Sequence, residues 1–253
     1  MDSAIEQIKM DLRKLGLPKN NNLLVHSSLR SLGDVPGGAE TVVRGLLEAL
    51  GPDGTLLFPA LSYRDVGIEH PVFDLRNTPC CVGALPEYFR KRPGTIRSIH
   101  PTHSVSGVGK NAEWLLGDHF KDTTPCGPRS PFRRLRELGG WILFIGCGIS
   151  PNTSMHAVEE LVEPFYLFTS PVDYRILLPD GGETRMRVRR HNFSGWTQMY
   201  ARLDALMDGE HLRKGKILAA DCYLMDVRDM WEKALVALKN NPLYFVKEIE
   251  KGA

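Results

Sequence analysis

The fold is decided by residues 22–59, which read NLLVHSSLRSLGDVPGGAETVVRGLLEALGPDGTLLFP. The apolar run at 22–26 is typical of a short buried strand, and the run at 54–59 has the same character and stops at a proline. Between them, residues 37–50 open with two glycines and continue as a helix. A strand, a helix and a second strand in this order form a βαβ unit, so we expect two parallel strands covered by a helix.

The rest of the chain continues this alternation. Residues 141–146 are the clearest buried strand, and residues 174–178 and 184–188 flank an Asp-Gly-Gly turn that indicates a hairpin. Helices are expected at 4–17, 85–92, 112–116, 131–138, 156–162, 196–206 and 227–238. We find no repeat and no linker-like break. The sequence therefore predicts an α/β fold in which residues 1–253 form a single main domain with a largely parallel central sheet flanked by helices.

Composition excludes several classes of protein. The chain of 253 residues has a net charge of +2, with 42% hydrophobic and 25% charged residues, as expected for a globular protein. Without a one-sided basic excess we expect no nucleic-acid partner, and without an apolar run of roughly 20 residues we expect no membrane span. The N-terminus lacks a signal-peptide pattern, and the five cysteines show no CxxC spacing, so we expect reduced thiols in the cytoplasm.

The residues best placed for chemistry follow the strand at 141–146, because α/β proteins place ligands at strand ends. His156 and Glu159 are three residues apart, so on a helix they share a face. A carboxylate beside an imidazole fixes its tautomer, which suits a general base. Thr153 lies one turn earlier, where its hydroxyl caps the helix or donates to an oxyanion. An ordinary capped helix with a surface His–Glu pair fits the same spacing.

Residues 27–38 form a candidate anion-binding loop. They combine hydroxyls, Arg30 and several glycines with a helix N-terminus, whose free N–H groups and dipole attract phosphate. The pattern is neither a Walker A loop nor GxGxxG, and an ordinary strand-to-helix turn is the alternative. The segment 104–107 could likewise approach an extended ligand such as pantetheine or simply pack closely. Ser130, before a proline, is most simply a helix N-cap.

The remaining histidines and arginines leave alternatives open. A zinc hypothesis is suggested by His100, His103, His156 and Glu159. Two of these lie in a proline-containing loop without HExxH or CxxC spacing, so we expect no metal. His191 is a substrate contact or a structural residue. The arginines within 185–190 predict a solvated strand face or a patch that contacts an anion.

Six short motifs stand in a fixed order along the chain. They are VHSSLRSLG at 25–33, VPGG at 35–38, GPDGTL at 51–56 with FP at 58–59, RSIHPTHSV at 97–105, GPRSP at 127–131 and NTSMHAVE at 152–159. Each alone is weak, but together and in register they resemble the aminoglycoside 3-N-acetyltransferase family, whose fold is distinct from that of the GNAT acetyltransferases. The resemblance runs from about residue 23 to residue 163 and more weakly to residue 242.

This resemblance implies that acetyl-coenzyme A is the acyl donor and that an amine attacks its thioester directly, without an acyl-enzyme. His156 is then expected to be the general base, Glu159 to orient it, and Thr153 to help hold the thioester or its oxyanion. The residues expected to contact coenzyme A are Ser27, Ser28, Leu29, Arg30, Ser31, Val35, Gly37, Gly38, Ser104, Val105, Ser106 and Ser130.

The resemblance also implies a small-molecule amine as partner, first of all the 3-amino group of a 2-deoxystreptamine aminoglycoside, whose acetylation gives antibiotic resistance. Because aminoglycosides are polycations, the cleft that receives them should be acidic. The expected acceptor contacts are Tyr63, Asp74, Glu160, Glu163 and His191. Solvated loop carboxylates are the alternative for the acids. The alternative acceptor is another amine, such as an amino sugar or amino phosphonate, and a zinc hydrolase or a non-catalytic coenzyme A-binding module are further alternatives.

Overall fold

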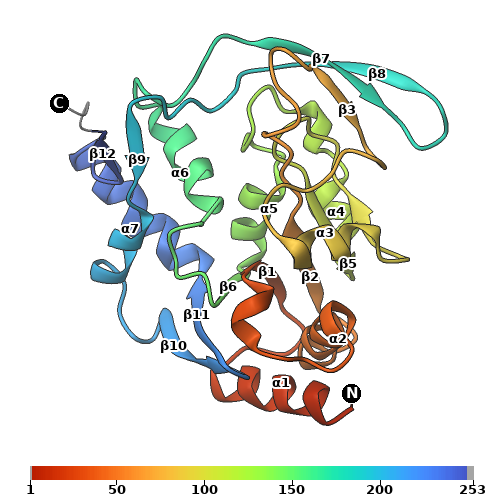
Figure 1. The fold of residues 1–253 in the computed structure, drawn as a ribbon. Coiled ribbons are helices and arrows are strands. Elements are labelled where there is room, and N and C mark those ends of the chain that lie inside the picture. The colour runs from red at the N-terminus through yellow and green to blue at the C-terminus, as the bar shows by residue number, and fades with distance from the viewer. Residues whose placement is uncertain (1, 250–253) are drawn as a thin grey trace.

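A seven-stranded sheet runs through the centre of the computed structural model, which describes residues 2–249 (Figure 1). The strands lie in the order β10-β11-β6-β1-β2-β5-β4. Their bounds are β1 Asn22–Ser27, β2 Thr55–Pro59, β4 Ile96–Arg97, β5 Val105–Gly109, β6 Trp141–Ile145, β10 Leu212–Ile217 and β11 Ala220–Asp226. The outermost positions of the expected domain, Met1 and residues 250–253, lie outside the described residues.

The three central strands of this sheet are parallel. β1 pairs in parallel with β2 on one side and with β6 on the other, which confirms the βαβ unit expected from residues 22–59. The outer pairs β10–β11, β11–β6, β2–β5 and β5–β4 are antiparallel. Two residues join β10 to β11, and so short a connection allows only an antiparallel hairpin. The α/β fold with a helix-flanked sheet is confirmed, whereas its largely parallel character is corrected to a parallel centre with antiparallel edges.

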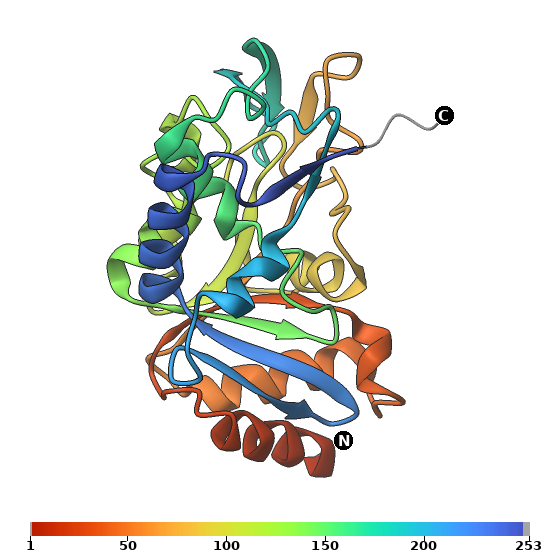
Figure 2. The ribbon, with the colours of Figure 1, turned by 90° about the vertical axis from the view of Figure 1, so that its left-hand side faces the viewer.

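Helices cover both faces of the sheet, as the alternation along β6 requires. Ile142 and Phe144 point into a core that they share with α4 to α7, whereas Trp141, Leu143 and Ile145 lie in a second core with α1 and α2. Figure 2 shows these two layers on opposite sides of the sheet. The helices are α1 Asp2–Lys14, α2 Gly38–Leu50, α3 Ala84–Lys91, α4 Ala112–Leu116, α5 Pro131–Leu138, α6 Ser154–Val162 and α7 Val227–Asn240, with 3-10 helices η1 Leu29–Leu32, η2 His119–Lys121 and η3 Tyr200–Ala205.

Two smaller sheets stand apart from the central one. The first contains β3 Val72–Asp74, β7 Val172–Leu177 and β8 Glu183–Val188, and its β7–β8 pair is the hairpin that the sequence predicts (Figure 1). Phe73 of β3 is buried with Tyr174 of β7, so part of the segment at 62–83, which is otherwise irregular before α3, is fixed on this sheet. The second pairs β9 Trp196–Gln198 with β12 Val246–Glu248.

The prediction of a helix at 196–206 is wrong, because this segment forms β9 and then η3. Trp196 and Gln198 pair with β12, so a partner far along the chain sets their backbone and overrides local spacing. Tyr200 and Leu203 are buried three residues apart, a spacing that a 3-10 helix also places on one side.

Within residues 2–249, no helix combines the length and the apolar character that a membrane crossing requires.

Candidate active site

His156 lies in the first turn of α6, beyond the carboxyl end of β6. The side-chain oxygen of Asn152 accepts a hydrogen bond from the backbone N–H of Ser154 at 3.1 Å, whereas the hydroxyl of Thr153 makes no such bond. Asn152 therefore caps the helix. Thr153 is left facing the cavities described below.

Glu159 fixes the orientation of the His156 ring. Its Oε2 atom lies 3.1 Å from Nδ1 of His156 and accepts a hydrogen bond from the hydroxyl of Tyr200 at 2.7 Å. Its Oε1 atom accepts a hydrogen bond from the hydroxyl of Tyr166 at 3.0 Å. Because an ionised carboxylate only accepts, Nδ1 of His156 carries the proton and Nε2 keeps its lone pair. An imidazole whose tautomer is set by a buried carboxylate in this way has the chemistry that a general base requires.

Tyr200 completes this network at the base of the site. Its hydroxyl lies 2.9 Å from Nδ1 of His156, and its side chain is fully buried. Burial and the neighbouring Glu159 carboxylate hold the pKa of Tyr200 well above its ordinary value, so it stays a hydrogen-bond donor at neutral pH. Tyr166 is held in the same state, since burial raises its pKa above the ordinary value.

Two further imidazoles surround His156. Its ring centroid lies 4.7 Å from that of His191, and His191 lies 4.9 Å from His103. Burial lowers the pKa of both His103 and His191 well below the ordinary value, so both are neutral at pH 7. The zinc hypothesis from sequence grouped His100 with His103, His156 and Glu159. The His100 ring instead stacks on that of His119, with centroids 4.7 Å apart, and its Nδ1 atom accepts from the backbone of its own turn.

Glu160 turns to the other side of α6 and supports His191. Its Oε1 atom lies 2.8 Å from Nε2 of His191, and it accepts hydrogen bonds from the hydroxyl of Thr124 at 2.6 Å and the backbone N–H of Cys126 at 2.8 Å. Burial raises its pKa to about 7 against the opposing effect of these bonds. Glu160 therefore positions a histidine and does not line the cavity around His156.

A cavity of about 380 Å³ opens in front of His156. A second cavity of about 180 Å³ shares Val82, Pro151 and Thr153 with it, and a third of about 740 Å³ shares Ser27 with the second. The three cavities thus follow one another from the loop after β1 to the imidazole of His156. The first is lined by Leu61, Tyr63, Val82, His103, Pro151, Asn152, Thr153, His156, Arg190, His191, Phe193, Gln198 and Tyr200.

Half of the residues expected to contact coenzyme A lie along this path. The third cavity is lined by Ser27, Ser28, Leu29, Arg30, Val35 and Gly38. Ser31 donates its hydroxyl to the carbonyl of Ser28, and Gly37 adopts a left-handed conformation directly before α2. These two residues shape the loop and line none of the three cavities.

The other four expected coenzyme contacts are buried beside the path. Ser104 donates its hydroxyl to the carbonyl of Ala60 at 2.7 Å, and Val105 belongs to the core. The hydroxyl of Ser106 is buried without a partner among the described residues. Ser130 caps α5 by accepting from the backbone N–H of Arg133, as the Ser-Pro pair predicts. None of the four lines the three cavities.

The expected acceptor contacts divide in the same way. Tyr63 and His191 line the cavity at His156. Asp74 accepts hydrogen bonds from two backbone N–H groups of its own turn, and Glu163 pairs with Arg189 at 3.0 Å. The lining contains no aspartate or glutamate from the described part of the chain, so the acidic cleft expected from the sequence is not formed by these carboxylates.

Sequence reasoning missed Tyr166, Tyr200 and Arg190 as site residues. Tyr200 lies 44 residues after His156 and reaches it only because η3 packs beside α6. Arg190 stands out in the sequence only as one of several arginines, yet it is the member of that group that lines the cavity. No local spacing signals either contact, since both depend on where the C-terminal segments return to the sheet.

Burial disfavours Cys147 and Cys126 as nucleophiles. All five are free, and Cys147 is the cysteine that borders the path. Burial raises its pKa to about 11, and raises that of Cys126 well above the ordinary value. Both thiols are therefore protonated at neutral pH.

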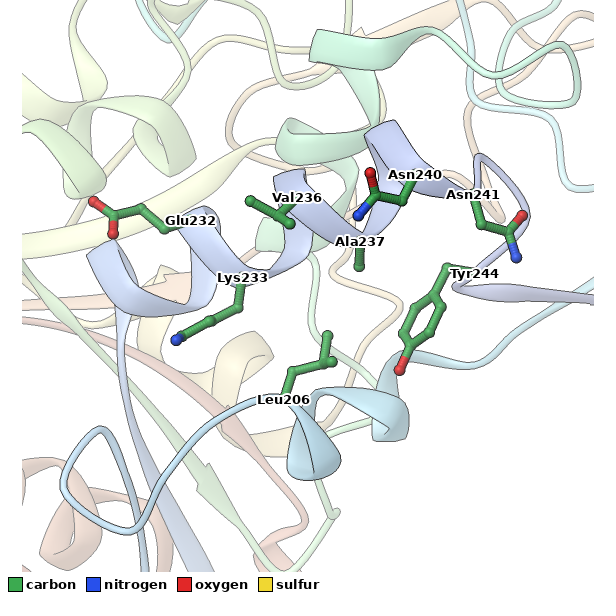
Figure 3. Close-up of a pocket in the computed structure, with 8 residues that line it drawn as sticks. All are labelled: Leu206, Glu232, Lys233, Val236, Ala237, Asn240, Asn241 and Tyr244. Carbon is green, nitrogen blue, oxygen red and sulfur yellow. The ribbon is translucent and has the colours of Figure 1, made fainter.

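A separate pocket of about 520 Å³ lies between α7 and η3 (Figure 3). Its lining is Leu206, Glu232, Lys233, Val236, Ala237, Asn240, Asn241 and Tyr244. It shares no residue with the cavities along the path, and its described lining holds no histidine or thiol, so we assign the chemistry to the His156 site.

The chain matches known proteins over almost its whole length. A family model described as aminoglycoside 3-N-acetyltransferase matches residues 24–239. Aminoglycoside N(3)-acetyltransferase IV of Salmonella sp is 30% identical over 95% of this chain and 89% of its own length. Among solved structures, a mutant of the aminoglycoside acetyltransferase AAC(3)-IVa in complex with a gentamicin has a TM-score of 0.80 and 28% identity, covering 95% of this chain and 90% of that one.

A second solved structure, AAC-IIIb as a binary complex with CoASH, has a TM-score of 0.81 and 25% identity, covering 93% of this chain and 96% of that one. The match therefore extends over the whole fold and is not confined to the motifs. The family expected from the six sequence motifs is confirmed by these matches. The chain belongs to the aminoglycoside 3-N-acetyltransferase family of acyltransferases.

Proposed function

We propose that this chain transfers an acetyl group from acetyl-coenzyme A to an amine, with His156 as general base. The observation that carries the proposal is the position of His156, fixed by Glu159 and Tyr200, at the inner end of the three consecutive cavities. A donor in the second and third cavities and an acceptor in the first would both lie next to His156, as direct transfer requires.

In the proposed reaction, the nitrogen of the acceptor amine attacks the thioester carbonyl carbon, and Nε2 of His156 takes a proton from that amine. A C–N bond forms, the C–S bond breaks, and the imidazolium returns its proton to the departing thiolate. Glu159 stabilises the transient imidazolium because its buried carboxylate lies 3.1 Å from Nδ1. Thr153, at the junction of two cavities, is placed to donate its hydroxyl to the carbonyl oxygen of the thioester.

The third cavity suits the phosphate end of coenzyme A. Gly37 precedes α2 without a side-chain cap, and the backbone N–H of Gly38 donates to the carbonyl of Val35. The next N–H groups of the first turn are the ones that can bind an anion. Ser28 and Arg30 line the same cavity. The 180 Å³ cavity then has the position for pantetheine, between this loop and Thr153. A related protein, AAC-IIIb, has been solved with CoASH, which supports the same donor here.

The first candidate acceptor is the 3-amino group of a 2-deoxystreptamine aminoglycoside. Related proteins are named for this activity, and one solved relative holds a gentamicin. Acetylation removes the positive charge of the attacked amine, which is the chemical basis of resistance by modification.

A second candidate acceptor is an amine that carries an anionic group. Arg190 lines the cavity at His156, no side-chain hydrogen bond or ion pair of its guanidinium is formed among residues 2–249, and no carboxylate of this part of the chain shares the lining. A cavity of this charge favours an anion over a polycation. An amino sugar phosphate or an amino phosphonate has the required combination of groups.

The experiment is a thiol-release assay with acetyl-coenzyme A and two sets of acceptors. One set contains gentamicin and sisomicin, and the other pairs glucosamine with glucosamine 6-phosphate. Turnover with the antibiotics supports the first candidate, and a preference for the phosphorylated sugar that Arg190→Gln removes supports the second. Arg187→Gln is the matched control, since Arg187 is exposed and lies 3.5 Å from Asp173 on the hairpin. Release of thiol with none of these amines would contradict the proposed function for both acceptor classes.

We further propose that residues 1–253 act as one catalytic domain in the cytoplasm. The path draws its lining from Val25 to Tyr200, so no short part of the chain forms the site by itself. Acetyl-coenzyme A, the proposed donor, is present in the cytoplasm. The five free cysteines also agree with that reducing compartment.

A further inference from the structure

Three imidazoles converge at the inner end of the path. One ring nitrogen each of His103, His156 and His191 lies within 4.8 Å of the other two. The three residues come from different places, the loop before β5, the first turn of α6 and the loop after β8. Their grouping is therefore a property of the fold that no spacing in the sequence contains.

Each of these rings has its other nitrogen engaged by a polar group. Nδ1 of His103 lies 2.9 Å from the hydroxyl of Thr102, Nδ1 of His156 lies 3.1 Å from Glu159, and Nε2 of His191 lies 2.8 Å from Glu160. The nitrogens left over are Nε2 of His103, Nε2 of His156 and Nδ1 of His191. This is the pattern of metal-binding histidines, whose outer nitrogen donates to a carboxylate or hydroxyl that sets the ring orientation.

The remaining nitrogen of His191 is a second, independent sign of a ligand. Its Nδ1 atom is buried without a hydrogen-bond partner among the described residues, and its side chain is only 5% exposed. An unpaired buried nitrogen is unfavourable, because folding removes the water that would hydrogen-bond to it and no protein group replaces that bond. A cation bound there would use its lone pair.

We propose that His103, His156 and His191 bind a divalent transition-metal cation of the zinc type, and that this binding blocks acetyl transfer. Three neutral imidazoles with an open fourth position are a ligand set that zinc prefers, whereas magnesium and calcium prefer oxygen. Tetrahedral coordination needs nitrogens roughly 3.3 Å apart, so the rings must rotate inward from the present separation of up to 4.8 Å.

Charged side chains around the three histidines raise or lower the affinity for a dication. Glu159 and Glu160 lie directly behind two of the ligands and offset the charge of a dication. Arg190 lines the same cavity and opposes it. The inhibition follows because Nε2 of His156 cannot bond a metal and accept the proton of an amine at once. That part rests on the proposed function, whereas the binding itself does not.

The test of binding uses chelator-treated, full-length protein titrated with ZnCl₂ by calorimetry and with CoCl₂ by visible absorption. We expect one ion per chain with nitrogen-dominated cobalt bands, and at least about tenfold weaker zinc binding in His103→Ala and in His191→Ala. His211→Ala is the matched control, because His211 is partly exposed and pairs with Asp208 away from the cavity. Cys81→Ser controls for half-buried thiols, which also bind zinc.

Glu160→Gln keeps the shape of the side chain but weakens the support of His191, so we expect a loss of zinc affinity of roughly 10- to 100-fold. Glu160 also accepts hydrogen bonds from Thr124 and Cys126, so an unchanged near-ultraviolet spectrum must show that the fold of the variant is intact. In the thiol-release assay, zinc should inhibit the wild type and a chelator should restore its rate. The metal site would be overturned if the wild type bound no zinc. It would also be overturned if Cys81→Ser lost zinc binding while His191→Ala kept it. One ion bound at these histidines without inhibition would overturn the inhibitory role alone, and absent acetyl transfer would overturn the proposed function while leaving the calorimetry intact.

Discussion

Glu159 is the residue on which the proposed catalytic arrangement depends. It is fully buried on α6, and three side chains meet its two oxygens, His156, Tyr200 and Tyr166. A buried carboxylate is costly unless its lone pairs are satisfied, and these partners satisfy them. The same bonds hold the His156 ring in one orientation, so the stability of the site and its chemistry share one network.

Glu159→Gln should therefore lower kcat by roughly 10- to 10,000-fold, because an amide neither stabilises an imidazolium nor fixes the tautomer of His156. Tyr200→Phe should lower kcat less, since it removes one donor to Glu159 and leaves the carboxylate in place. Steady-state thiol release, with kcat and KM measured separately, checks both variants. A Gln variant with the kcat of the wild type would show that Glu159 is structural.

Glu160 makes the folded protein sensitive to pH. Its pKa is about 7 in the folded state against an ordinary value of 4.5, so the folded state holds the extra proton between these two values. Stability must then fall as pH rises through this interval. Relative to Glu160→Gln, the wild type should lose up to about 3 kcal/mol of unfolding free energy between pH 4.5 and 7. Urea unfolding of both proteins at the two pH values measures this difference, and parallel pH profiles would contradict it.

For single residues, the sequence predicts the pair His156 and Glu159 but not the side chains that contact this pair. The pair is three residues apart on a helix, which is a local property. Tyr200 and His191 reach the ring from later segments, and their contacts depend on packing that local spacing does not encode. The acidic cleft is expected from charge alone, and the structure instead uses Asp74 in a turn and Glu160 behind a histidine.

Among the elements, β6 connects the core to the site. Its alternating side chains join both hydrophobic cores, and its carboxyl end leads through Gly146 into the loop before α6. Gly146 has a φ of 61°, and a Cβ atom there would lie 1.7 Å from the hydroxyl oxygen of Ser31. The end of β6 therefore packs directly against the loop that lines the third cavity.

Gly146→Ala should destabilise the fold by about 1–3 kcal/mol and weaken coenzyme A binding, because the Ser31 turn must move to admit a methyl group. Gly148→Ala is the matched control. Gly148 has a φ of 63°, but nothing lies within 4 Å of the added Cβ, so it carries the same backbone strain without the clash. Urea unfolding and calorimetry with coenzyme A measure the two effects, and equal results for the two variants would contradict the packing argument.

Helices and strands with a strong local pattern are predictable from the sequence, whereas strands that are fixed by a distant partner strand are not. The unit β1-α2-β2 and strand β6 are apolar and buried, so their patterns are strong in the sequence. Strand β10 is polar in its middle, where Lys214, Gly215 and Lys216 are exposed at the edge of the sheet, and it shows no such pattern. β9 exists because β12 pairs with it. Edge strands of this kind are set by their partner.

At the scale of the whole molecule, elements from distant parts of the sequence together line the three consecutive cavities. Three of the six motifs that indicate the family lie at β1, at the start of α2 and on α6, and the fold places these three along the consecutive cavities. The charge of the inner cavity is not predictable from the sequence, because Arg190 reaches it from the segment that follows β8.

The central claim is that His156 is the base of an acetyl-coenzyme A-dependent transferase, and a paired measurement on His156→Ala tests it most directly. Coenzyme A binding by calorimetry should be the same in the variant and the wild type, since His156 lies beyond the cavity assigned to the coenzyme. Amine-dependent thiol release should fall by roughly 100- to 10,000-fold in the variant. Near-normal thiol release by His156→Ala, with coenzyme A still bound, would contradict the claim.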